Sequence, residues 1–533
     1  MICLIDRDLP CKTALRAVVL CGVLALLGAS AQIFITRHGI GVSPDSTAYI
    51  MTARSFMGGH GITMPTADGG FTPVTQWPPL FPLVLAGVGI CGVQPLAGAE
   101  LVNSVLFGAN IMLVGLLVLL YTRSSGAALA GAFFYATAPD ILKVHTWAWS
   151  EPSFIFLMLL ELVLLQAHFD SGNRYLLIAA AVAASLVCLC RYAGLALIGA
   201  GMGGILALGK GTPRKRLSDC VCFGAIACLP IALWMTRNYT LGGNAVSRPV
   251  AFHPPGLGEL KDGLLQASKW GALPHYLPTV AKFGAPLVGL AGMIYLALRS
   301  LCKARKEDSE LLEPARAASI PHLLTIALLS YLGLLVFSMA FVEEGIRLNE
   351  ERLMSPLHTL ALSAAVPVAY WFLSRTRMKP ASMAVAVAAT LIMLNIGKHN
   401  LAATVPWAFA RSTDGAQYTS RAWKESEIMQ KVRALPPGIA IWSNASDALE
   451  FLTGRLSYRI PSKVVAGSNR PVEDFGFQMR KFEQDLRTKN GVVVYVSAVD
   501  WRWNLPSEVE LVARLGLKAV DKSPDGRIYV AVK

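Results

Sequence analysis

The sequence predicts a polytopic α-helical membrane protein of about eleven spans, which ends in a small C-terminal α/β soluble domain. Of its 533 residues, 54% are hydrophobic and only 15% are charged, whereas soluble proteins carry roughly 25% charged residues. Within the first 400 residues, segment after segment is apolar and long enough to cross a hydrocarbon core about 30 Å thick. The last 130 or so residues lack such segments, so we expect them to fold in water.

The candidate spans are nearly uncharged segments, at residues 14–35, 80–93, 101–121, 127–141, 152–169, 175–190, 192–208, 220–235, 280–298, 320–341, 353–373 and 381–396. The segment 80–93 differs from the rest because it is short, follows Trp77-Pro78-Pro79 and contains Pro82 and three glycines. These features are typical of a re-entrant or interfacial segment.

The distribution of basic residues gives an independent test of that interpretation. If segment 80–93 does not cross, the basic clusters at 210–216, 299–306 and 375–379 all lie on the side of Arg7, Lys12 and Arg16. If it crosses, all three clusters lie outside, against the positive-inside rule. We therefore expect eleven spans, with the N-terminus in the cytoplasm and the C-terminal domain outside.

The net charge of +14 and the ten cysteines have simple explanations in such a protein. The Lys and Arg residues cluster beside apolar spans and not along one face of a domain, so we expect no nucleic-acid partner. Nearly all cysteines lie inside spans or near the predicted cytoplasmic side, which predicts no structural disulfide. The first apolar segment is longer than that of most signal peptides, and we interpret it as an uncleaved anchor.

The sequence divides into a membrane part at residues 1–400, a helical connector at 401–435 and an extracytoplasmic α/β domain at 436–533. The first outer loop of the membrane part spans residues 36–100. After Pro436-Pro437-Gly438, short β-rich runs alternate with helical patterns. This domain has no phosphate-binding glycine motif, and we interpret it as an accessory or acceptor-side domain.

The first outer loop contains Pro44-Asp45-Ser46-Thr47-Ala48-Tyr49, then Gly58-Gly59-His60-Gly61, then Gln76-Trp77-Pro78-Pro79-Leu80. With these motifs the membrane part resembles the lipid-dependent glycosyltransferases of the GT-C class, especially the bacterial branch related to protein O-mannosyltransferases and aminoarabinose transferases. In that family an acid after the first span begins an Asp-x-x-x-Tyr pattern, and a Pro-Pro-Leu stretch opens a loop helix that does not span.

The resemblance implies a GT-C-like fold and a sugar donor linked to polyprenyl phosphate, used at the periplasmic face of a bacterial inner membrane. Asp45 would be the general base that deprotonates an acceptor hydroxyl, with Tyr49 and His60 as candidate substrate contacts. The alternative role of Asp45 is to cap the helix that follows it. Many relatives have two adjacent acids here, but this chain has Ser46 in second place, which argues against a divalent metal. We expect no cofactor.

The second outer loop carries Lys143, His145 and then Trp149-Ser150-Glu151-Pro152. Glu151 resembles the second acidic position of the family, which would hold a sugar hydroxyl or a metal. It could equally be a helix-start acid favoured by the macrodipole. For His145 an interfacial position is the alternative to a role in the site.

Three arginines lie at outer span ends in contexts that resemble family segments: Arg191, Arg237 and Arg352. Each is a candidate to bind the leaving lipid phosphate, and each could instead reach lipid head groups at the interface. Arg352 is the first choice, because its Arg-x-x-x-Pro context matches a family span opening.

Two other functions fit a protein with many spans. A membrane transporter or lipid flippase would need buried ionisable groups and repeated halves, and Glu161 is the obvious acid inside a span. A catalytically inactive scaffold for the α/β domain is the third hypothesis. The sugar, and whether the acceptor is a glycan, a lipid or a protein, cannot be deduced from the sequence.

Overall fold

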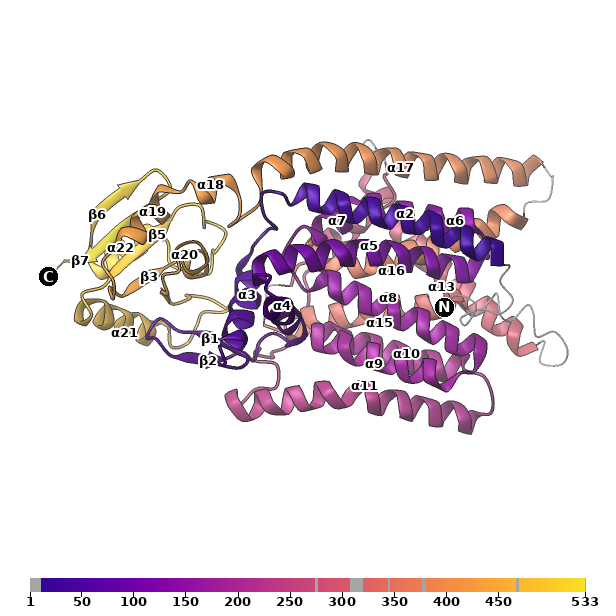
Figure 1. Ribbon diagram of the computed structural model, residues 1–533, viewed down its shortest axis with the longest axis horizontal. Helices are drawn as coiled ribbons and strands as arrows, with labels where there is room; N and C mark the ends of the chain where they lie inside the picture. Colours follow the sequence, from indigo (N-terminus) through magenta and orange to yellow (C-terminus); the bar gives the residue numbers. More distant parts are fainter. Residues whose placement is uncertain are drawn as a thin grey trace.

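The protein consists of a long helical bundle with a smaller sheet-containing domain at one end (Figure 1). The structure is a computed structural model, and it describes residues 11–273, 277–306, 320–343, 346–375, 380–465 and 469–532. Arg7 and residues 376–379 of the third basic cluster lie outside these ranges.

The bundle is built from helices that run roughly along its long axis (Figure 1). They are α2 (Cys11–Ile35), α5 (Pro95–Thr122), α6 (Ser125–Thr137), α8 (Glu151–Ser171), α9 (Arg174–Cys190), α10 (Leu195–Leu208), α11 (Pro213–Gly242), α13 (Thr279–Lys306), α15 (Ile320–Phe341), α16 (Glu351–Arg375) and α17 (Pro380–Asp414).

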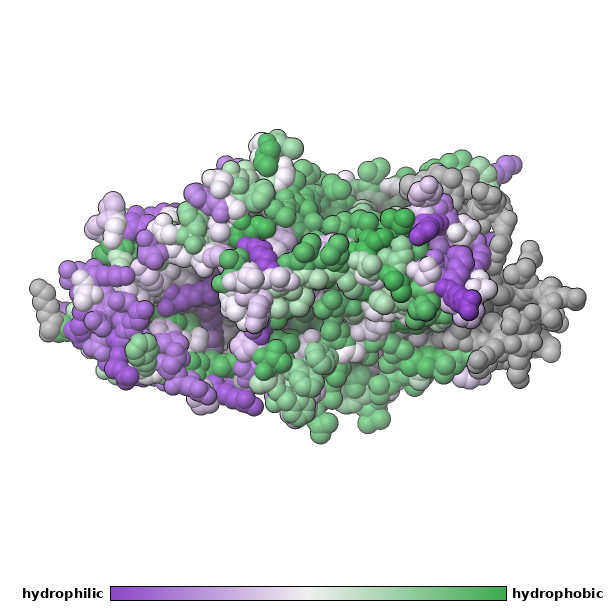
Figure 2. Space-filling view, turned by 90° about the horizontal axis from the view of Figure 1, so that it is seen from below, coloured by the Kyte–Doolittle hydropathy of each residue, from purple (hydrophilic) through white to green (hydrophobic). Residues whose placement is uncertain are grey.

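Among the described residues, six helices are long and apolar enough to cross a membrane, and further apolar helices are shorter. Figure 2 shows the corresponding hydrophobic surface along the bundle, with hydrophilic residues gathered at its two ends. A multi-pass membrane protein is therefore the class that these helices define.

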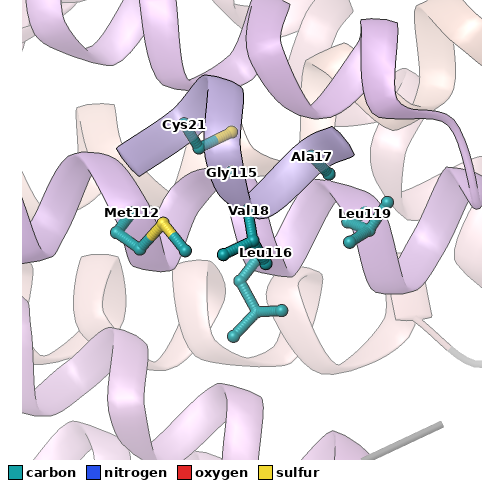
Figure 3. Close-up of a pocket in the computed structure, with 7 residues that line it drawn as sticks. All are labelled: Ala17, Val18, Cys21, Met112, Gly115, Leu116 and Leu119. Atoms are coloured by element: carbon teal, nitrogen blue, oxygen red, sulfur yellow. The ribbon is translucent and has the colours of Figure 1, made fainter. Parts of the chain in front are cut away.

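Small residues allow α2 and α5 to pack closely. Figure 3 shows Ala17, Val18 and Cys21 of α2 against Gly115 of α5. A Cβ atom added to Gly108 of α5 would lie 2.9 Å from the backbone oxygen of Ala25 in α2. Glycine at such contacts is typical of membrane helices, where packing replaces the hydrophobic effect as the driving force.

The first outer loop folds into α3 (Pro44–Met57), the hairpin β1 (Thr63–Pro65) and β2 (Phe71–Pro73), and α4 (Leu80–Ile90). Helix α4 has 11 residues and is about 16 Å long, too short to cross a bilayer. It lies beside α3 at the end of the bundle that faces the small domain (Figure 1).

One expected span is divided in the structure. Residues 127–141 form α6, which ends at Thr137, and the separate short helix α7 (Pro139–His145). Ala138 between them is extended, with φ −63° and ψ 118°, as the residue before a proline prefers. The break turns α7 and its side chains toward the second outer loop. The other short outer elements are η1 (Tyr192–Gly194) and α12 (Leu257–Lys269).

The small domain has a five-stranded sheet of order β4-β3-β5-β7-β6. Strand β3 pairs in parallel with β4 and β5, and β7 pairs antiparallel with β5 and β6. Its elements are α18 (Arg421–Lys424), α19 (Glu427–Ala434), β3 (Ile441–Ser443), α20 (Ser446–Thr453), β4 (Tyr458–Arg459), α21 (Phe475–Thr488), β5 (Val492–Val496), α22 (Glu508–Leu515), β6 (Leu517–Ser523) and β7 (Gly526–Ala531). The mixture of helices and strands follows the alternating patterns of the sequence.

The small domain and the first outer loop share one hydrophobic core. Tyr49 and Ile50 of α3 and Phe81 of α4 belong to the same cluster of buried side chains as Leu449 and Val494 of the domain. Backbone bridges join residue pairs Gly41 with Trp147 and Val42 with Gln417. The domain is thus fixed to the loop that carries Asp45.

Replacing Gly108 with Ala should destabilise the bundle by about 1–3 kcal/mol, because the new methyl group meets backbone of α2 that cannot rotate away. Gly22→Ala is the matched control, since a Cβ there has nothing within 4 Å. Thermal unfolding of the purified protein in detergent measures both. Equal stability of the two variants would contradict the proposed close contact.

Candidate active site

Two acids and two arginines form a connected cluster at the end of the bundle that adjoins the small domain. Arg352 Nη1 lies 2.8 Å from Asp45 Oδ2, and Arg352 Nε lies 2.7 Å from Glu151 Oε1. Arg191 Nη1 lies 2.6 Å from the same Glu151 oxygen. These four residues, far apart in the sequence, were all site candidates, and the fold brings them together.

Helix ends position all four side chains. Asp45 and Glu151 lie in the first turns of α3 and α8, and Arg191 is the C-cap of α9. Arg352 is the second residue of α16. The cap of α3 is Ser43, whose Oγ accepts a hydrogen bond from the backbone N–H of Ser46. Capping is therefore done by Ser43, and the carboxylate of Asp45 is available to Arg352.

The charges in the cluster compensate one another. Burial acts to raise the pKa of Asp45, but the charge of Arg352, followed by those of Arg191 and Arg248, outweighs it and lowers that pKa from its usual value. Asp45 is therefore an ionised carboxylate at neutral pH. Glu151 is 1% exposed, and its Oε2 has no hydrogen-bond partner among the described residues. One carboxylate oxygen of Glu151 is thus left to accept a further donor.

Tyr49 lies against the same cluster. Its hydroxyl is 3.4 Å from Ser150 Oγ, which also accepts a hydrogen bond of 3.3 Å from Arg191 Nη1. Burial, followed by the charge of Asp45, raises the pKa of Tyr49. The phenol stays protonated and is available as a hydrogen-bond donor.

The guanidinium of Arg352 packs against a pair of stacked tryptophan rings. Its guanidinium carbon lies 4.7 Å from the ring centre of Trp149, and Trp149 stacks on Trp147 at 4.8 Å with planes 8° apart. The indole N–H of Trp149 donates to Ser43 Oγ over 2.8 Å. One tryptophan therefore contacts both the arginine and the cap of the helix that bears Asp45, which fixes their relative position.

The remaining candidates lie apart from the cluster. His145 is fully buried, with Nδ1 2.8 Å from the carbonyl oxygen of Ile141 and Nε2 3.1 Å from Asn110, and burial lowers its pKa to about 4. His60 is exposed and stacks on Phe71 at 3.8 Å. Both imidazoles have local packing partners.

Arg237 holds the first loop in place. Its Nη1 donates to the carbonyl oxygen of Val74 over 2.9 Å, and its guanidinium lies over Trp234 at 4.5 Å. It also donates to the carbonyl oxygen of Ile62 and to Asn238 Oδ1, so its contacts hold the first loop and do not reach the acids of the cluster.

The sequence did not single out Arg248, whose charge acts on Asp45. It lies in the outer loop between α11 and α12, away from the span ends where cations were sought. The contribution of Ser150 to the cluster was also missed. Ser150 lies directly before Glu151, so a search of the neighbours of each candidate acid would have found it.

Within the described part of the chain, no three His, Cys, Asp or Glu side chains gather as metal ligands do. Both acids of the cluster are bonded to guanidinium groups. The arrangement suits an anion that competes for these guanidinium groups and a polar group near the carboxylates.

Solved structures with similar folds are membrane glycosyltransferases. ArnT from Cupriavidus metallidurans, bound to undecaprenyl phosphate, is similar over 95% of this chain and 97% of its own, with TM-score 0.57 and 11% identity. The oligosaccharyltransferase AglB from Archaeoglobus fulgidus, in complex with an inhibitory peptide and a dolichol-phosphate, matches 90% of this chain and 69% of its own, with TM-score 0.53 and 14% identity. The arabinofuranosyltransferase AftD from Mycobacteria matches 96% of this chain and 41% of its own, with TM-score 0.51 and 15% identity.

No protein-family profile matches the sequence, and a comparison with curated proteins found no similar one. The likeness lies in the fold: the chain has a GT-C-like fold, as its resemblance to that class predicted.

Replacing Glu151 with Gln should cost about 3–5 kcal/mol of stability, because it removes a buried charge that two partly buried arginines share. Glu351→Gln is the control, since its pair with Lys143 is partly exposed and contributes less than about 1 kcal/mol. Denaturant unfolding in detergent compares the two. Similar losses in both variants would show that the buried cluster is not held by this charge.

Proposed function

We propose that the protein is a glycosyltransferase that moves a sugar from a polyprenyl-phosphate donor to an acceptor hydroxyl, with Asp45 as general base. The observation that carries the proposal is the cluster of Asp45, Arg191 and Arg352 around the buried Glu151 in a GT-C-like fold. Lipid phosphates in the structures of ArnT and AglB support a donor of the same class.

The proposal includes eleven spans, a cytoplasmic N-terminus and a site on the periplasmic face of a bacterial inner membrane. The start of α2 and the basic loop between α10 and α11 lie at the opposite end of the bundle from α3 and the small domain (Figure 1). A cytoplasmic position for the basic end agrees with the positive-inside rule and leaves the acid–arginine cluster outside.

The chemistry of such a transfer matches the charges of the cluster. Asp45 takes the proton of the acceptor hydroxyl as its oxygen attacks the anomeric carbon, and the bond from that carbon to the phosphate oxygen breaks. Arg352 and Arg191 would hold the leaving lipid phosphate. The Oε2 atom of Glu151 would accept a hydroxyl of the sugar. No metal enters the proposal, because Ser46 stands where many relatives have a second acid.

A carboxylate with a lowered pKa is a weak base, but binding of the donor would raise the pKa of Asp45. When the phosphate takes hydrogen bonds from Arg352, that arginine stabilises the Asp45 carboxylate less, and the pKa of Asp45 rises. The base then becomes stronger only once the donor is bound. His60, His145 and Arg237 would act indirectly, through the shape of the outer loops.

The acceptor would approach beside the small domain. Figure 2 shows a hollow between this domain and the bundle, with hydrophilic residues in its walls. Because the domain shares a core with α3, its surface would help to orient a glycan, lipid or protein acceptor toward Asp45.

Glu161 keeps the transporter or flippase hypothesis open. It is 1% exposed inside α8, and its Oε2 has no partner among the described residues. Buried acids of this kind are common in transport pathways. A new glycosidic product formed in detergent would favour transfer, whereas movement of substrate through intact vesicles without such a product would favour transport.

Cells that lack the protein should lose one sugar from an envelope glycan or glycoprotein, and Asp45→Asn should fail to restore it. The amide cannot accept the hydroxyl proton, a loss of about 10²- to 10⁴-fold in rate. Mass spectrometry of envelope glycans is the measurement. Asp68→Asn, in the exposed hairpin of the same loop, should restore the sugar fully. Full restoration by Asp45→Asn at wild-type protein level would refute the base assignment.

The pH dependence of transfer should shift when Arg352 is replaced by Gln. The rate falls as Asp45 becomes protonated, and because its pKa is lowered from the usual value of an aspartate, the acid limb of kcat/KM lies at low pH in the wild type. Loss of the main lowering charge raises that pKa and moves the limb to higher pH. The control is Arg54→Gln, which removes an exposed charge from α3, the helix that bears Asp45. It should leave the acid limb at the same pH. An unmoved limb in Arg352→Gln would contradict the pairing.

A further inference from the structure

Two exposed tryptophans distinguish the loop that follows β5. Trp501 and Trp503 lie in the segment 497–507, between β5 and α22, and are 45% and 44% exposed. An indole ring carries a large apolar surface, and covering that surface with a partner is favourable. Two half-exposed indoles so close together on the small domain make this loop a candidate binding surface.

The loop is held in one conformation by hydrogen bonds to its neighbours. Arg502, between the two tryptophans, donates from Nη1 to the carbonyl oxygen of Asn444 over 2.6 Å and from Nη2 to Asp447 Oδ1 over 2.7 Å. The carbonyl oxygen of Asn504 accepts a hydrogen bond of 2.8 Å from the backbone N–H of Lys463. Because the backbone is already fixed, a ligand that binds here loses little free energy to ordering the loop.

The loop lies on the side of the domain that faces the bundle. Strand β7 runs antiparallel to β5 and leads toward the end of the domain far from the bundle (Figure 1), so the carboxyl end of β5 points toward the bundle. Val499, two residues before Trp501, is 2% exposed and belongs to the buried cluster that contains Tyr49 of α3. This is the side on which Figure 2 shows the hollow between domain and bundle.

The position in the sheet agrees with a ligand site. Strand β5 is parallel to β3, and the ligands of open α/β sheets bind beyond the carboxyl ends of parallel strands. Because β5 lies between β3 and β7, its end does not offer a free strand edge to which a peptide could add. The loop therefore presents side chains, and not backbone groups, to its ligand.

The chemistry of these side chains suits a sugar. A pyranose ring has a face of C–H groups that stacks on an aromatic ring, and hydroxyl groups around its rim that need hydrogen-bond partners. The exposed Ser497 and Asp500 precede the tryptophans, and the amide of Asn504, which donates to Ser462 Oγ over 3.2 Å, follows them. An acyl chain on this surface would desolvate the polar groups without pairing them.

We propose that Trp501 and Trp503 form a binding surface for a saccharide chain, and that the acceptor of the transfer is a glycan. The second part rests on the proposed function, whereas saccharide binding stands without it. The chain would stack on the indoles at the edge of the domain and extend across the hollow toward Asp45. The domain would thus select the acceptor, while the acid–arginine cluster of the bundle acts on its hydroxyl.

The first test measures saccharide binding by the intact purified protein in detergent, with no sugar donor present. The probe is the pool of oligosaccharides released by mild acid from the envelope of cells that lack the protein, because the unmodified acceptor accumulates there. Saturation-transfer NMR identifies the bound sugars, and tryptophan fluorescence gives their affinity. The variant Trp501→Ala/Trp503→Ala should bind about tenfold more weakly, since it loses two stacking contacts.

The matched control is Phe477→Ala, which removes an exposed aromatic ring from α21 of the same domain. It should bind like the wild type. Failure of the wild type to bind any oligosaccharide, or equal affinities of all three proteins, would overturn the proposal. If the double variant does not fold, Trp503→Ala replaces it, because this change keeps the contact of Trp501 with Arg502 at 4.7 Å.

The membrane surface is the other partner that exposed tryptophans commonly have. Nanodiscs that contain phosphatidylcholine with brominated acyl chains separate the two, because bromine quenches the fluorescence of an indole that it contacts. The proposal expects the part of the fluorescence that the double variant lacks to be unquenched in the wild type. Quenching of that part would overturn the assignment to a saccharide.

A transfer assay then separates this proposal from the proposed function. If the acceptor binds at the tryptophans, the double variant should raise the KM for the acceptor more than it lowers kcat. Transfer with an unchanged KM in the double variant would refute the acceptor site and leave the proposed function standing. Saccharide binding that needs the tryptophans, without any transfer product, would confirm the site and refute the proposed function.

Discussion

The sharing of Arg352 between two carboxylates is the constraint on which the end of the bundle beside the small domain depends. Asp45 begins the first-loop helix, Glu151 begins α8, and Arg352 begins α16, so one guanidinium joins three segments distant in sequence. An acid as buried as Glu151 would be costly without counter-charges. Because Glu151 Oε1 accepts from two arginines, the helix ends must meet at one point, and the loops between them are shaped accordingly.

The same ion pairs explain the positions of the aromatic residues Trp147 and Trp149 in the second loop. A planar guanidinium can bond two acids in its plane and still present its face to an indole, and Trp149 occupies that face. Trp147 continues the stack to Arg411 at the end of α17, 5.1 Å away. Gly41 must be small, because its Cβ would lie 2.8 Å from the Trp147 ring. The close contact of the Gly41 backbone with Trp147 and the stacking of the two tryptophan rings thus restrict the movement of the cluster.

Much of this organisation could be predicted from the sequence, and the failures have physical reasons. The helices could be predicted from the apolar segments, because every span in lipid must satisfy its backbone hydrogen bonds internally. Asp45, Glu151, Arg191 and Arg352 were predicted as site residues because their sequence contexts at span ends resemble GT-C segments. The division at Pro139 was missed because the apolar run continues across it, and Arg248 was missed because only the tertiary fold brings a mid-loop cation near Asp45. The contacts of His145 with Asn110 and of His60 with Phe71 could not be predicted, because they depend on side-chain packing in the folded protein.

The small domain has a role in the site that its own sequence does not suggest. Its core residues Leu449 and Val494 pack in one cluster with Tyr49 and Ile50, about one turn along α3 from Asp45. Tyr418, before the domain, donates to Asp447 Oδ2 over 2.8 Å, and Arg502 binds the other oxygen at 2.7 Å, so the joint between connector and domain is itself a buried polar network. An isolated helix of 14 residues is only marginally stable in water. The orientation of Asp45 therefore depends on the packing of α3 against the domain as well as on the ion pair with Arg352.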